Sequence, residues 1–437
     1  MVTTDAIQPR RFLSVLWDGG GNVPPQLAVM RRLVARGHEV RVLAPRVLEE
    51  RIVAAGCQFV PYSRAPEHES ASPEHDLLRD WTARTPLGAA ASVRDQVMAG
   101  PALTFAQDVL AVLEDYPADV VVPDYLLLGA YLGAERASLP TAALIHHIYP
   151  FPDPALPPFG FGFQPASNAP GYLRDAVMRR LFRSFYEAAR PPLNEARNAL
   201  GLAPLSSVFD LFARLDRALV LTSAAFDFPS AALPGNVRYV GPQLDAPPAT
   251  TAWEGLWDAA DGRPFVVVSL STTFQRQEDV IHRLISALGT LPIRALVTVG
   301  PALDIQSYQT PSNVVVRSYV PHQEVFPQAD LVITHGGHGT VMRALACGVP
   351  VLCLPMGRDQ ADVAARVVWR GAGLSMSSGS RPDALRAAVA RMLDEPRFRD
   401  GARRIAEAMA REDGALLAVR ELEALPARLP DGLQLVS

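Results

Sequence analysis

The sequence predicts an α/β protein of two Rossmann-like domains, each built on a doubly wound parallel sheet, that face one another across a cleft. Three observations support this prediction. Short aliphatic runs alternate with helical patterns through both halves of the chain. A stretch rich in Pro, Ala and Thr interrupts this alternation near the middle. The chain of 437 residues is also too long for a single core, because one domain usually holds roughly 100–200 residues.

The composition indicates a globular protein and argues against several functions. With 49% hydrophobic and 20% charged residues, the chain has no tract polar enough to stay unfolded. A net charge of -4 gives no basic field, so we expect no nucleic-acid partner. The first ten residues lack an apolar signal-peptide core, and no stretch of about 18 uncharged apolar residues occurs. We therefore expect a cytoplasmic protein with no membrane span.

The first domain is predicted to cover residues 1–241. An apolar strand at 12–16 runs into a turn of glycines and prolines, and apolar residues at helical spacing follow from Leu27 to Val34. A second strand at 40–43 completes a βαβ unit, whose strands are parallel. The remaining strands of this domain are expected at 120–122, 141–145 and 217–221.

The second domain is predicted to cover residues 264–437, after a linker at 242–263 that loses strand and helix periodicity. Its Ala- and Arg-rich tail, 382–425, predicts two or three helices. Its strands are expected at 265–271, 294–300, 313–320, 329–337 and 349–355. Because open parallel sheets bind ligands at the carboxyl ends of their strands, the loops of both domains are expected to meet in one cleft. That arrangement suits an enzyme that joins two substrates.

The densest chemical signal is the run THGGHGT at 334–340, where a strand leads into a glycine-rich turn. Thr340 is the expected helix N-cap. The glycines let backbone N–H groups approach a ligand, and the helix N-terminus adds partial positive charge, so the turn suits a phosphate or diphosphate. His335 could donate a further hydrogen bond. One strand later, Asp359 and Gln360 offer a carboxylate and an amide that suit sugar hydroxyls.

Two plainer interpretations of this region stay open. The glycine-rich turn and the Asp-Gln pair can be purely structural. Alternatively, His335 and His338 can begin a zinc site, although no third ligand is near in sequence and the glycines would have no role in it.

The turn WDGGGNVPPQL at 17–27 does not fit a dinucleotide-binding fingerprint. The pattern G-x-G-x-x-G requires glycine at Pro24, and the second strand ends in Ala44-Pro45-Arg46 without an acidic residue for a ribose. The glycines instead fit the close approach of a second substrate. Pro24 and Pro25 fit the first turn of a helix, where a missing N–H costs nothing.

The stretch 334–367 resembles the donor-binding signature of the glycosyltransferase family 1 enzymes with the GT-B fold, in particular the bacterial ones that glycosylate natural products. The resemblance lies in motifs in the C-terminal half and in architecture over the whole chain. It implies that the turn after 334 holds the nucleotide diphosphate, that the segment 318–326 packs on the base, and that the loop 269–274 approaches the bond being broken. The implied donor-binding residues are Ser271, Thr272, Tyr319, Val320, His335, Gly336, Gly337, Gly339, Thr340, Asp359 and Gln360.

The sequence lacks the motif that metal-dependent glycosyltransferases usually carry. Glycosyltransferases that rely on Mg²⁺ or Mn²⁺ usually show an Asp-x-Asp motif, and this chain contains none. We therefore expect no metal and no cofactor, with a dTDP- or UDP-linked sugar as co-substrate. The helix dipole and hydrogen bonds would stabilise the departing diphosphate.

The general base is the point where this chain departs from the family. The loop matching 17–27 usually carries a His, sometimes an Asp, that takes the proton from the acceptor hydroxyl. Here the position is Asn22, whose amide is too weakly basic near neutral pH. Three alternatives remain: Asp18 is the base; Asp124, matching the carboxylate that orients the His in relatives, acts directly or through water; or the protein catalyses little. Asn22 would then position the acceptor or hydrogen-bond Asp124.

The acceptor is expected to be an apolar small molecule that enters the N-terminal domain. The aromatic residues of ALPPFGFGFQP at 155–165 can form walls of its site, although core packing explains them equally well. Histidines that follow a strand here are more often packing or acceptor contacts than catalysts. The expected acceptor contacts are Trp17, His146, His147, Phe159 and Phe161.

The sequence therefore predicts a glycosyltransferase, monomeric or homodimeric, that moves a sugar from dTDP or UDP to a hydroxyl of a hydrophobic natural product. The resemblance implies that the reaction inverts the anomeric centre. One alternative is a non-catalytic nucleotide-sugar-binding homologue or an auxiliary protein of a partner glycosyltransferase. Another is a different sugar-nucleotide enzyme on the same fold, such as a hydrolase or epimerase.

Overall fold

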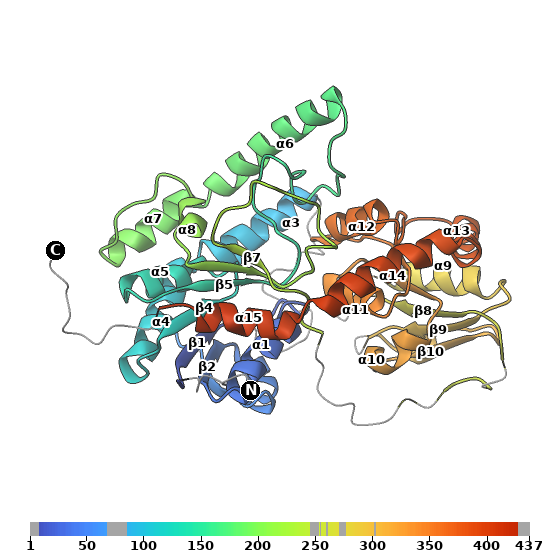
Figure 1. Cartoon of the computed structure of the whole chain (residues 1–437), viewed down its shortest axis with the longest axis horizontal. Helices are drawn as coiled ribbons and strands as arrows, with labels where there is room; N and C mark the ends of the chain where they lie inside the picture. The colour runs from blue at the N-terminus through green and yellow to red at the C-terminus, as the bar shows by residue number, and fades with distance from the viewer. Residues whose placement is uncertain are drawn as a thin grey trace, which may run out of the picture.

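The computed structural model describes residues 8–67, 85–244, 253, 255–258, 261–270, 277–300 and 303–426. Two α/β bodies lie side by side along the long axis of the molecule (Figure 1). The predicted donor-binding residues Ser271 and Thr272 lie outside the described residues.

The N-terminal body is built on parallel strands in the order β3-β2-β1-β4, continued by β5-β6-β7. Two backbone bridges, Val121 to Thr141 and Asp124 to Leu144, join β4 to β5, so the strands form one continuous layer. Every strand predicted for this half is present, and β3 and β7 are additional. The strands are β1 (Arg11–Val15), β2 (Glu39–Ala44), β3 (Gln58–Pro61), β4 (Val120–Pro123), β5 (Ala142–Ile145), β6 (Arg217–Val220) and β7 (Val237–Tyr239).

The order of strands reverses between β1 and β4, and this reversal sets the position of the first loop. Val15 at the end of β1 is in register with Leu43 of β2 and Pro123 of β4. The loops after β1 and β4 therefore leave the sheet side by side, at the point where open α/β sheets bind ligands.

Helices cover both faces of this sheet. The helix α1 starts at Val23, with Pro24 and Pro25 in its first turn as predicted, and buries Leu27, Met30 and Leu33 against the sheet. The helices are α1 (Val23–Ala35), α2 (Glu49–Ala54), α3 (Pro86–Val93), α4 (Ala102–Asp115), α5 (Leu128–Arg136), α6 (Ala169–Glu187), α7 (Arg190–Ala199) and α8 (Asp210–Ala213). Helix α6 projects beyond the rest of this body (Figure 1).

One helical run in the described residues, Leu87–Asp115, is long and apolar enough to cross a membrane by length and composition. In the most apolar 18-residue window of this run, 44% is buried. Phe105 and Val109 belong to the core, and α5 packs closely on this run because Gly129 has no side chain: a Cβ there would lie 2.2 Å from the Ala102 carbonyl oxygen. A core helix of a globular domain has these features, so the run is weak support for a membrane span.

The C-terminal body has six parallel strands in the order β10-β9-β8-β11-β12-β13. This is the strand order of dinucleotide-binding folds, with the reversal between β8 and β11. All five predicted strands are present, and β13 is additional. The strands are β8 (Phe265–Ser269), β9 (Arg294–Thr298), β10 (Val314–Arg317), β11 (Leu331–Thr334), β12 (Val351–Cys353) and β13 (Gly373–Ser375). The helices are α9 (Glu278–Leu288), α10 (His322–Val325), α11 (His338–Ala346), α12 (Gln360–Trp369), α13 (Pro382–Asp394), α14 (Pro396–Arg411) and α15 (Gly414–Glu423).

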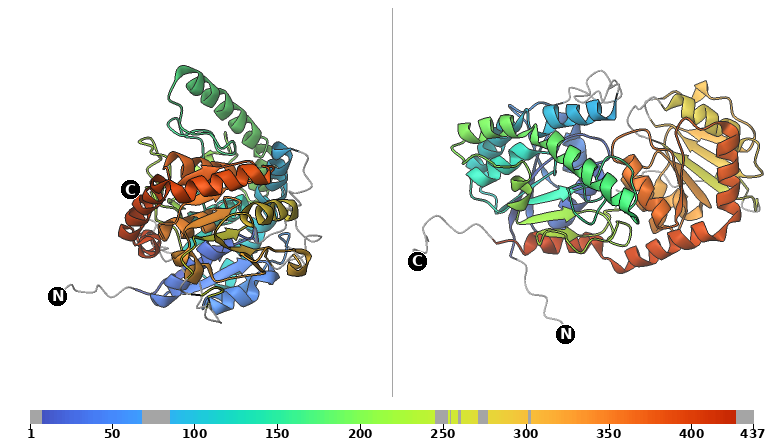
Figure 2. Two further views of the ribbon diagram at one scale, coloured as in Figure 1. Left: turned by 90° about the vertical axis from the view of Figure 1, so that its right-hand side faces the viewer. Right: turned by 90° about the horizontal axis from the view of Figure 1, so that it is seen from above.

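The last helix, α15, returns to the N-terminal body. Ala418, Val419 and Leu422 share a core with α1 and β2, and the Glu423 carboxylate accepts hydrogen bonds from Arg36. Helices α14 and α15 run along one side of the molecule and connect both bodies (Figure 2). The tail thus holds three helices. The predicted C-terminal domain, 264–437, includes α15, but in the structure α15 packs on the N-terminal body.

Candidate active site

The loop after β1 is closed by Asn22, which is almost fully buried. Its Oδ1 accepts a hydrogen bond from Gly19 N at 2.9 Å, and its Nδ2 donates to the Trp17 carbonyl oxygen at 2.9 Å. A Cβ at Gly19 would lie 2.8 Å from the Trp17 ring, and Gly20 has a φ of 79°. Gly19 and Gly20 are therefore required by the geometry of this turn, whereas Gly21 has open space around its Cβ position.

Asp124, directly after β4, lies beneath this loop and is completely buried. Its Oδ2 accepts from Asn22 Nδ2 at 2.9 Å and from Gln26 Nε2, while its Oδ1 accepts from Leu126 N at 3.0 Å. The hydrogen bond between Asn22 and Asp124 is one of the two roles predicted for Asn22. Burial acts to raise the pKa of Asp124, but the neighbouring His146, the Leu126 N–H and Asn22 together hold the pKa below its ordinary value. Asp124 is thus an anion surrounded by donors.

Asp18 is half-buried in the same loop. Its Oδ1 accepts a hydrogen bond from Gly20 N at 3.0 Å, so the carboxylate helps to form the turn. The role of Asp18 as general base stays a prediction.

The two histidines after β5 are engaged differently. His147 Nδ1 lies 2.7 Å from the Ile148 carbonyl oxygen and therefore donates to it, while Nε2 accepts from the Tyr125 hydroxyl at 2.7 Å. Burial lowers the pKa of His147 to about 4, so this ring is neutral near pH 7. His146 Nδ1 lies 3.5 Å from Asp124 Oδ2, and its side chain keeps 17% of its surface exposed.

The aromatic segment expected to contact the acceptor is attached to the C-terminal body. Phe159 stacks on His147, with ring centroids 5.4 Å apart, and also packs against the core beneath β11. Asp362 of α12 accepts hydrogen bonds from Gly160 N at 2.8 Å and Gly162 N at 3.2 Å. Burial raises the pKa of Asp362 to about 6. The loop that carries Phe159 is therefore held by the helix that follows the predicted sugar-binding residues.

Of the other predicted acceptor contacts, Phe161 belongs to the same loop and Trp17 to the N-terminal core. Phe161 stacks on Phe163 with ring centroids 5.5 Å apart and is partly exposed. Trp17 is buried in the N-terminal core, and its Nε1 has no hydrogen-bond partner among the residues that the structure describes. Core packing thus explains most of the Trp17 surface.

The turn after β11 differs from the prediction at its cap. Helix α11 begins at His338 with Gly337 as N-cap, so the prediction that Thr340 caps the helix is wrong. Gly337 has no side chain to cap this N-terminus, so the first N–H groups of α11 can bond another partner. Gly336 has a φ of 94°, and a Cβ at Gly337 would lie 2.5 Å from His335 Nε2. Gly339, in contrast, has open space around its Cβ position.

His335 follows β11 and Asp359 follows the neighbouring strand β12, so the two residues lie on adjacent loops. Burial lowers the pKa of His335 to about 4, which makes the ring neutral near pH 7 and a hydrogen-bond donor through one nitrogen. Burial acts to raise the pKa of Asp359, but His147, His146 and His338 hold it below its ordinary value. Asp359 is therefore an anion that faces the histidines of the N-terminal body.

Gln360 is buried, and its Oε1 accepts from Met356 N at 2.8 Å and Gly357 N at 3.1 Å. Its carbonyl oxygen thus closes the loop before α12. Tyr319, after β10, has 73% of its surface exposed, whereas the Val320 side chain is buried in the core. Tyr319 is available to stack on a base, and Val320 can offer only its backbone.

The structure does not support the zinc alternative. The described residues contain no group of three or more His, Cys, Asp or Glu side chains that could hold a metal ion. His338 instead reaches across the two bodies: its Nε2 lies 2.8 Å from the Thr222 hydroxyl, which follows β6. Burial lowers the pKa of His338 to about 3, so this contact is made by a neutral ring.

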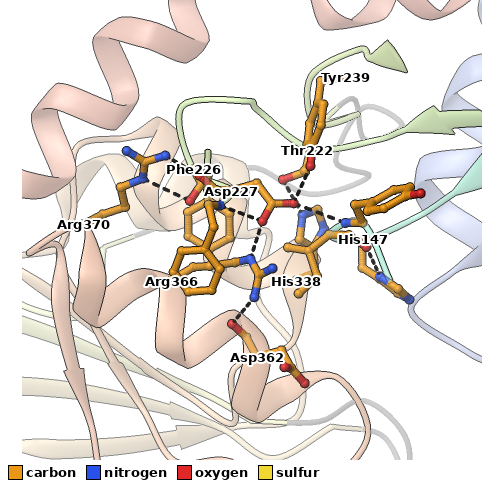
Figure 3. A network of polar contacts seen from close by, with 12 residues as sticks. His147, Thr222, Phe226, Asp227, Tyr239, His338, Asp362, Arg366 and Arg370 are labelled. Atoms are coloured by element: carbon orange, nitrogen blue, oxygen red, sulfur yellow. Dashed lines mark hydrogen bonds and ion pairs between the residues drawn. The ribbon is translucent and has the colours of Figure 1, made fainter. Parts of the chain in front are cut away.

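A buried ion pair strengthens the same junction (Figure 3). Asp227, in the loop after β6, accepts a hydrogen bond from Arg366 Nε of α12 at 2.6 Å. The Tyr239 hydroxyl donates to the other Asp227 oxygen at 2.8 Å. Arg370, one turn further along α12, donates to the Phe226 carbonyl oxygen at 3.2 Å. These contacts set α12, and with it Asp359, against the N-terminal body.

Several of these residues were not identified from the sequence. Gln26 lies one helical turn after Asn22, so the helix period alone places it on the same face of α1. Two further residues, Thr222 and Asp227, follow β6, and Asp362 lies in the first turn of α12. The partner of each is more than a hundred residues away in the chain. No local pattern indicates those pairs.

The Phe159 loop allows a paired test of its attachment. We expect Gly162→Ala to lower stability by about 1–3 kcal/mol and to raise KM for the acceptor, because φ is 65° and the new Cβ would lie 2.9 Å from Ala361 Cβ. Gly160→Ala is the control, since Gly160 also has a positive φ but open space around its Cβ position. Thermal unfolding and acceptor kinetics compare them. Equal losses in both variants would show that the contact with Ala361 is unimportant.

Comparison of the sequence with known proteins finds relatives named for the biosynthesis of natural products. The family model described as erythromycin biosynthesis protein CIII-like, C-terminal domain, matches residues 282–425. The 4'-demethylrebeccamycin synthase of Lentzea aerocolonigenes is 34% identical over 427 residues, which span 95% of this chain and 99% of that protein. The oleandomycin glycosyltransferase of Streptomyces antibioticus is 29% identical over 93% of this chain and 89% of its own length.

Solved structures resemble the fold over nearly the whole chain. The calicheamicin glycosyltransferase CalG4 superposes with a TM-score of 0.74 at 22% identity, covering 95% of this chain and 98% of that one. The glycosyltransferase of kitacinnamycin gives the same TM-score of 0.74. The two-body architecture is therefore the one found in those proteins.

Proposed function

The chain belongs to the natural-product glycosyltransferases of family 1 with the GT-B fold, and on that premise we propose that it transfers a sugar from dTDP or UDP to a hydroxyl of a hydrophobic small molecule. One observation carries the proposal. Asp359, after β12 of the C-terminal body, interacts electrostatically with His146 and His147, after β5 of the N-terminal body. A sugar held at Asp359 would thus face the groups around Asp124.

The donor half of the proposal rests on the uncapped N-terminus of α11. Its free N–H groups and the helix dipole favour an anion there, and His335 at the end of β11 can donate a hydrogen bond to the same ligand. Asp359 would accept from sugar hydroxyls. Tyr319, exposed after β10, would stack on the base.

The acceptor half rests on the surfaces around Asp124. Phe159, Phe161 and His147 present stacked aromatic rings between the two bodies. Flat apolar faces with a few polar groups suit a polycyclic or macrocyclic molecule better than a sugar. The similarity to the 4'-demethylrebeccamycin synthase and the oleandomycin glycosyltransferase, both named for natural products, supports a natural product as acceptor.

The proposal includes inversion at the anomeric carbon and a departing diphosphate stabilised without metal by α11 and His335. Absence of an Asp-x-Asp motif supports the second point. The proposal also includes a cytoplasmic location, where sugar nucleotides are formed. The full-length similarity to enzymes favours transfer over the non-catalytic alternative.

Calorimetric titration of UDP, dTDP and GDP against the purified protein tests the donor site directly. We expect micromolar binding of UDP or dTDP, weakened about tenfold in His335→Ala, because the loss of a hydrogen bond to a charged group costs about 1.5–3 kcal/mol. His282→Ala is the control, since this histidine is exposed and packs only on Tyr308 in the described structure. Failure of every nucleotide to bind would overturn the proposed donor site.

A further inference from the structure

The proposed transfer needs a group that takes the proton from the acceptor hydroxyl, and most candidates at the N-terminal switch point are already engaged. Asn22 is an amide with both polar atoms bonded. Asp124 is buried under four polar neighbours, and its pKa is held low. His147 uses both ring nitrogens, one as donor and one as acceptor. None of these three side chains has a lone pair directed at a substrate.

His146 differs from them in two ways. Its Nδ1 is buried without a hydrogen-bond partner among the described residues, and it faces Asp124 Oδ2 at 3.5 Å. Among the described residues, no hydrogen bond to its Nε2 is present, and the side chain keeps 17% of its surface exposed. A carboxylate on one ring nitrogen and an accessible second nitrogen form the arrangement of an oriented general base.

We propose that His146 is the general base of this enzyme, oriented by Asp124 through Nδ1 and facing the acceptor through Nε2. The inference rests on the proposed function. Asn22 and Gln26 then act as positioning residues, because they donate to Asp124 Oδ2, the same oxygen that His146 Nδ1 faces. A separation of 3.5 Å is long for a hydrogen bond, and such contacts shorten when substrate fills the site.

The charged and titratable groups around His146 come from four elements. Asp124 and Tyr125 follow β4, and His147 is its neighbour after β5. Asp359 at the start of α12 and His338 at the start of α11 interact with it electrostatically from the other body. The two carboxylates, Asp124 and Asp359, would stabilise the positive charge that forms on the ring when His146 removes the acceptor proton.

The step balances as follows. The acceptor O–H proton moves to His146 Nε2, and the acceptor oxygen forms a bond to the anomeric carbon of the sugar. The bond from that carbon to the diphosphate oxygen breaks, and its electron pair leaves with the nucleotide diphosphate toward α11 and His335. The proton on His146 is then released to solvent. Asp124 keeps its negative charge throughout.

A pair of probes of the same shape tests this role. 2-Naphthol needs a base to lose its proton, whereas 2-naphthalenethiol is largely ionised at about pH 8 and needs none. We expect His146→Gln to lower kcat/KM for 2-naphthol by about 100-fold or more and to change the rate with the thiol little. The acid limb of the pH profile with 2-naphthol should disappear in the same variant.

The controls separate the possible failures. His282→Gln, the same change at an exposed histidine outside the site, should leave both rates unchanged. Equal losses with both probes in His146→Gln, or no loss with either, would overturn the proposal. A loss confined to 2-naphthol in Asp18→Asn, with His146→Gln unaffected, would assign the base to Asp18 instead. If the wild-type protein binds nucleotide but glycosylates neither probe, the acceptor class of the proposed function fails.

Discussion

Replacing Asp124 by Asn is expected to lower kcat by about 100- to 10,000-fold and stability by about 1–3 kcal/mol. The carboxylate accepts from Asn22, Gln26 and the Leu126 N–H, and all three donors point inward. An amide at position 124 has one accepting oxygen and brings two donors of its own. At least one of the surrounding N–H groups would then face another donor in a site without solvent.

The expected loss of activity has a separate cause. The imidazolium of His146, once formed, needs the negative charge that lies 3.5 Å from its Nδ1. Without this charge, the proposed base would lose both its orientation and the stabilisation of its charged form. Asp124→Asn should therefore also lower the rate with 2-naphthol more than the rate with 2-naphthalenethiol.

Asp108→Asn is a matched control for the change at position 124. Asp108 is also a buried carboxylate of the N-terminal body, and it accepts from the backbone N–H groups of Ser63, Arg64 and Ala65. Asp108→Asn should lower the free energy of unfolding about as much as Asp124→Asn does, with much less effect on kcat. Unfolding in urea and steady-state kinetics compare the two variants. If kcat falls equally in both, Asp124 has no specific catalytic role.

The pH dependence of stability follows from the lowered pKa of Asp124. Because the folded state holds this pKa below the unfolded value, the unfolded state binds the proton more readily. The stabilisation is complete above the ordinary range of an aspartate, about pH 4, and is lost as pH falls through the lowered pKa. Asp124→Asn removes this part of the pH dependence, so the difference between variant and wild type should shrink in acid.

The sequence predicted the fold and part of this site, each for its own physical reason. Strands buried on both faces are continuous aliphatic runs, so β1, β4, β8 and β11 are evident from the sequence, whereas short edge strands such as β3 and β13 are not. The hydrogen bond between Asn22 and Asp124 was one of two roles predicted for Asn22, because Asp124 matches the carboxylate that orients the His in relatives. The start of α11 was misplaced because Thr340 is a good N-cap, yet Gly337 already ends the extended backbone.

The role proposed for His146 could not be inferred from sequence, since it depends on which neighbouring nitrogen is already bonded. His146 and His147 are adjacent and share the same local pattern. The two rings are distinguished by the bonds of His147 to the Ile148 carbonyl oxygen and the Tyr125 hydroxyl, and by the contact of His146 with Asp124. Pairs between the bodies are hidden in the same way, because nothing within a few residues of Asp227 points to Arg366.

Replacing Asp227 by Ala is expected to destabilise the protein by about 3–5 kcal/mol, the usual effect of removing one partner of a buried ion pair. Only 2% of the Asp227 side chain and 4% of the Arg366 side chain are exposed, so water cannot replace the lost carboxylate. The Tyr239 hydroxyl and the Phe228 N–H would lose their acceptor too. Calorimetric unfolding should show the loss as a lower transition temperature.

The double variant Asp227→Ala, Arg366→Met separates the ion pair from packing. Arg366 lies over the Phe228 ring at 4.2 Å, and Met can keep much of that contact without charge. The double variant should therefore be more stable than Asp227→Ala alone, because no uncompensated charge stays buried. Its affinity for a nucleotide sugar should still fall, since Arg366 joins α12 and Asp359 to the N-terminal body (Figure 3). If the double variant is instead the less stable of the two, burial of the Arg366 charge is not what makes the single change costly.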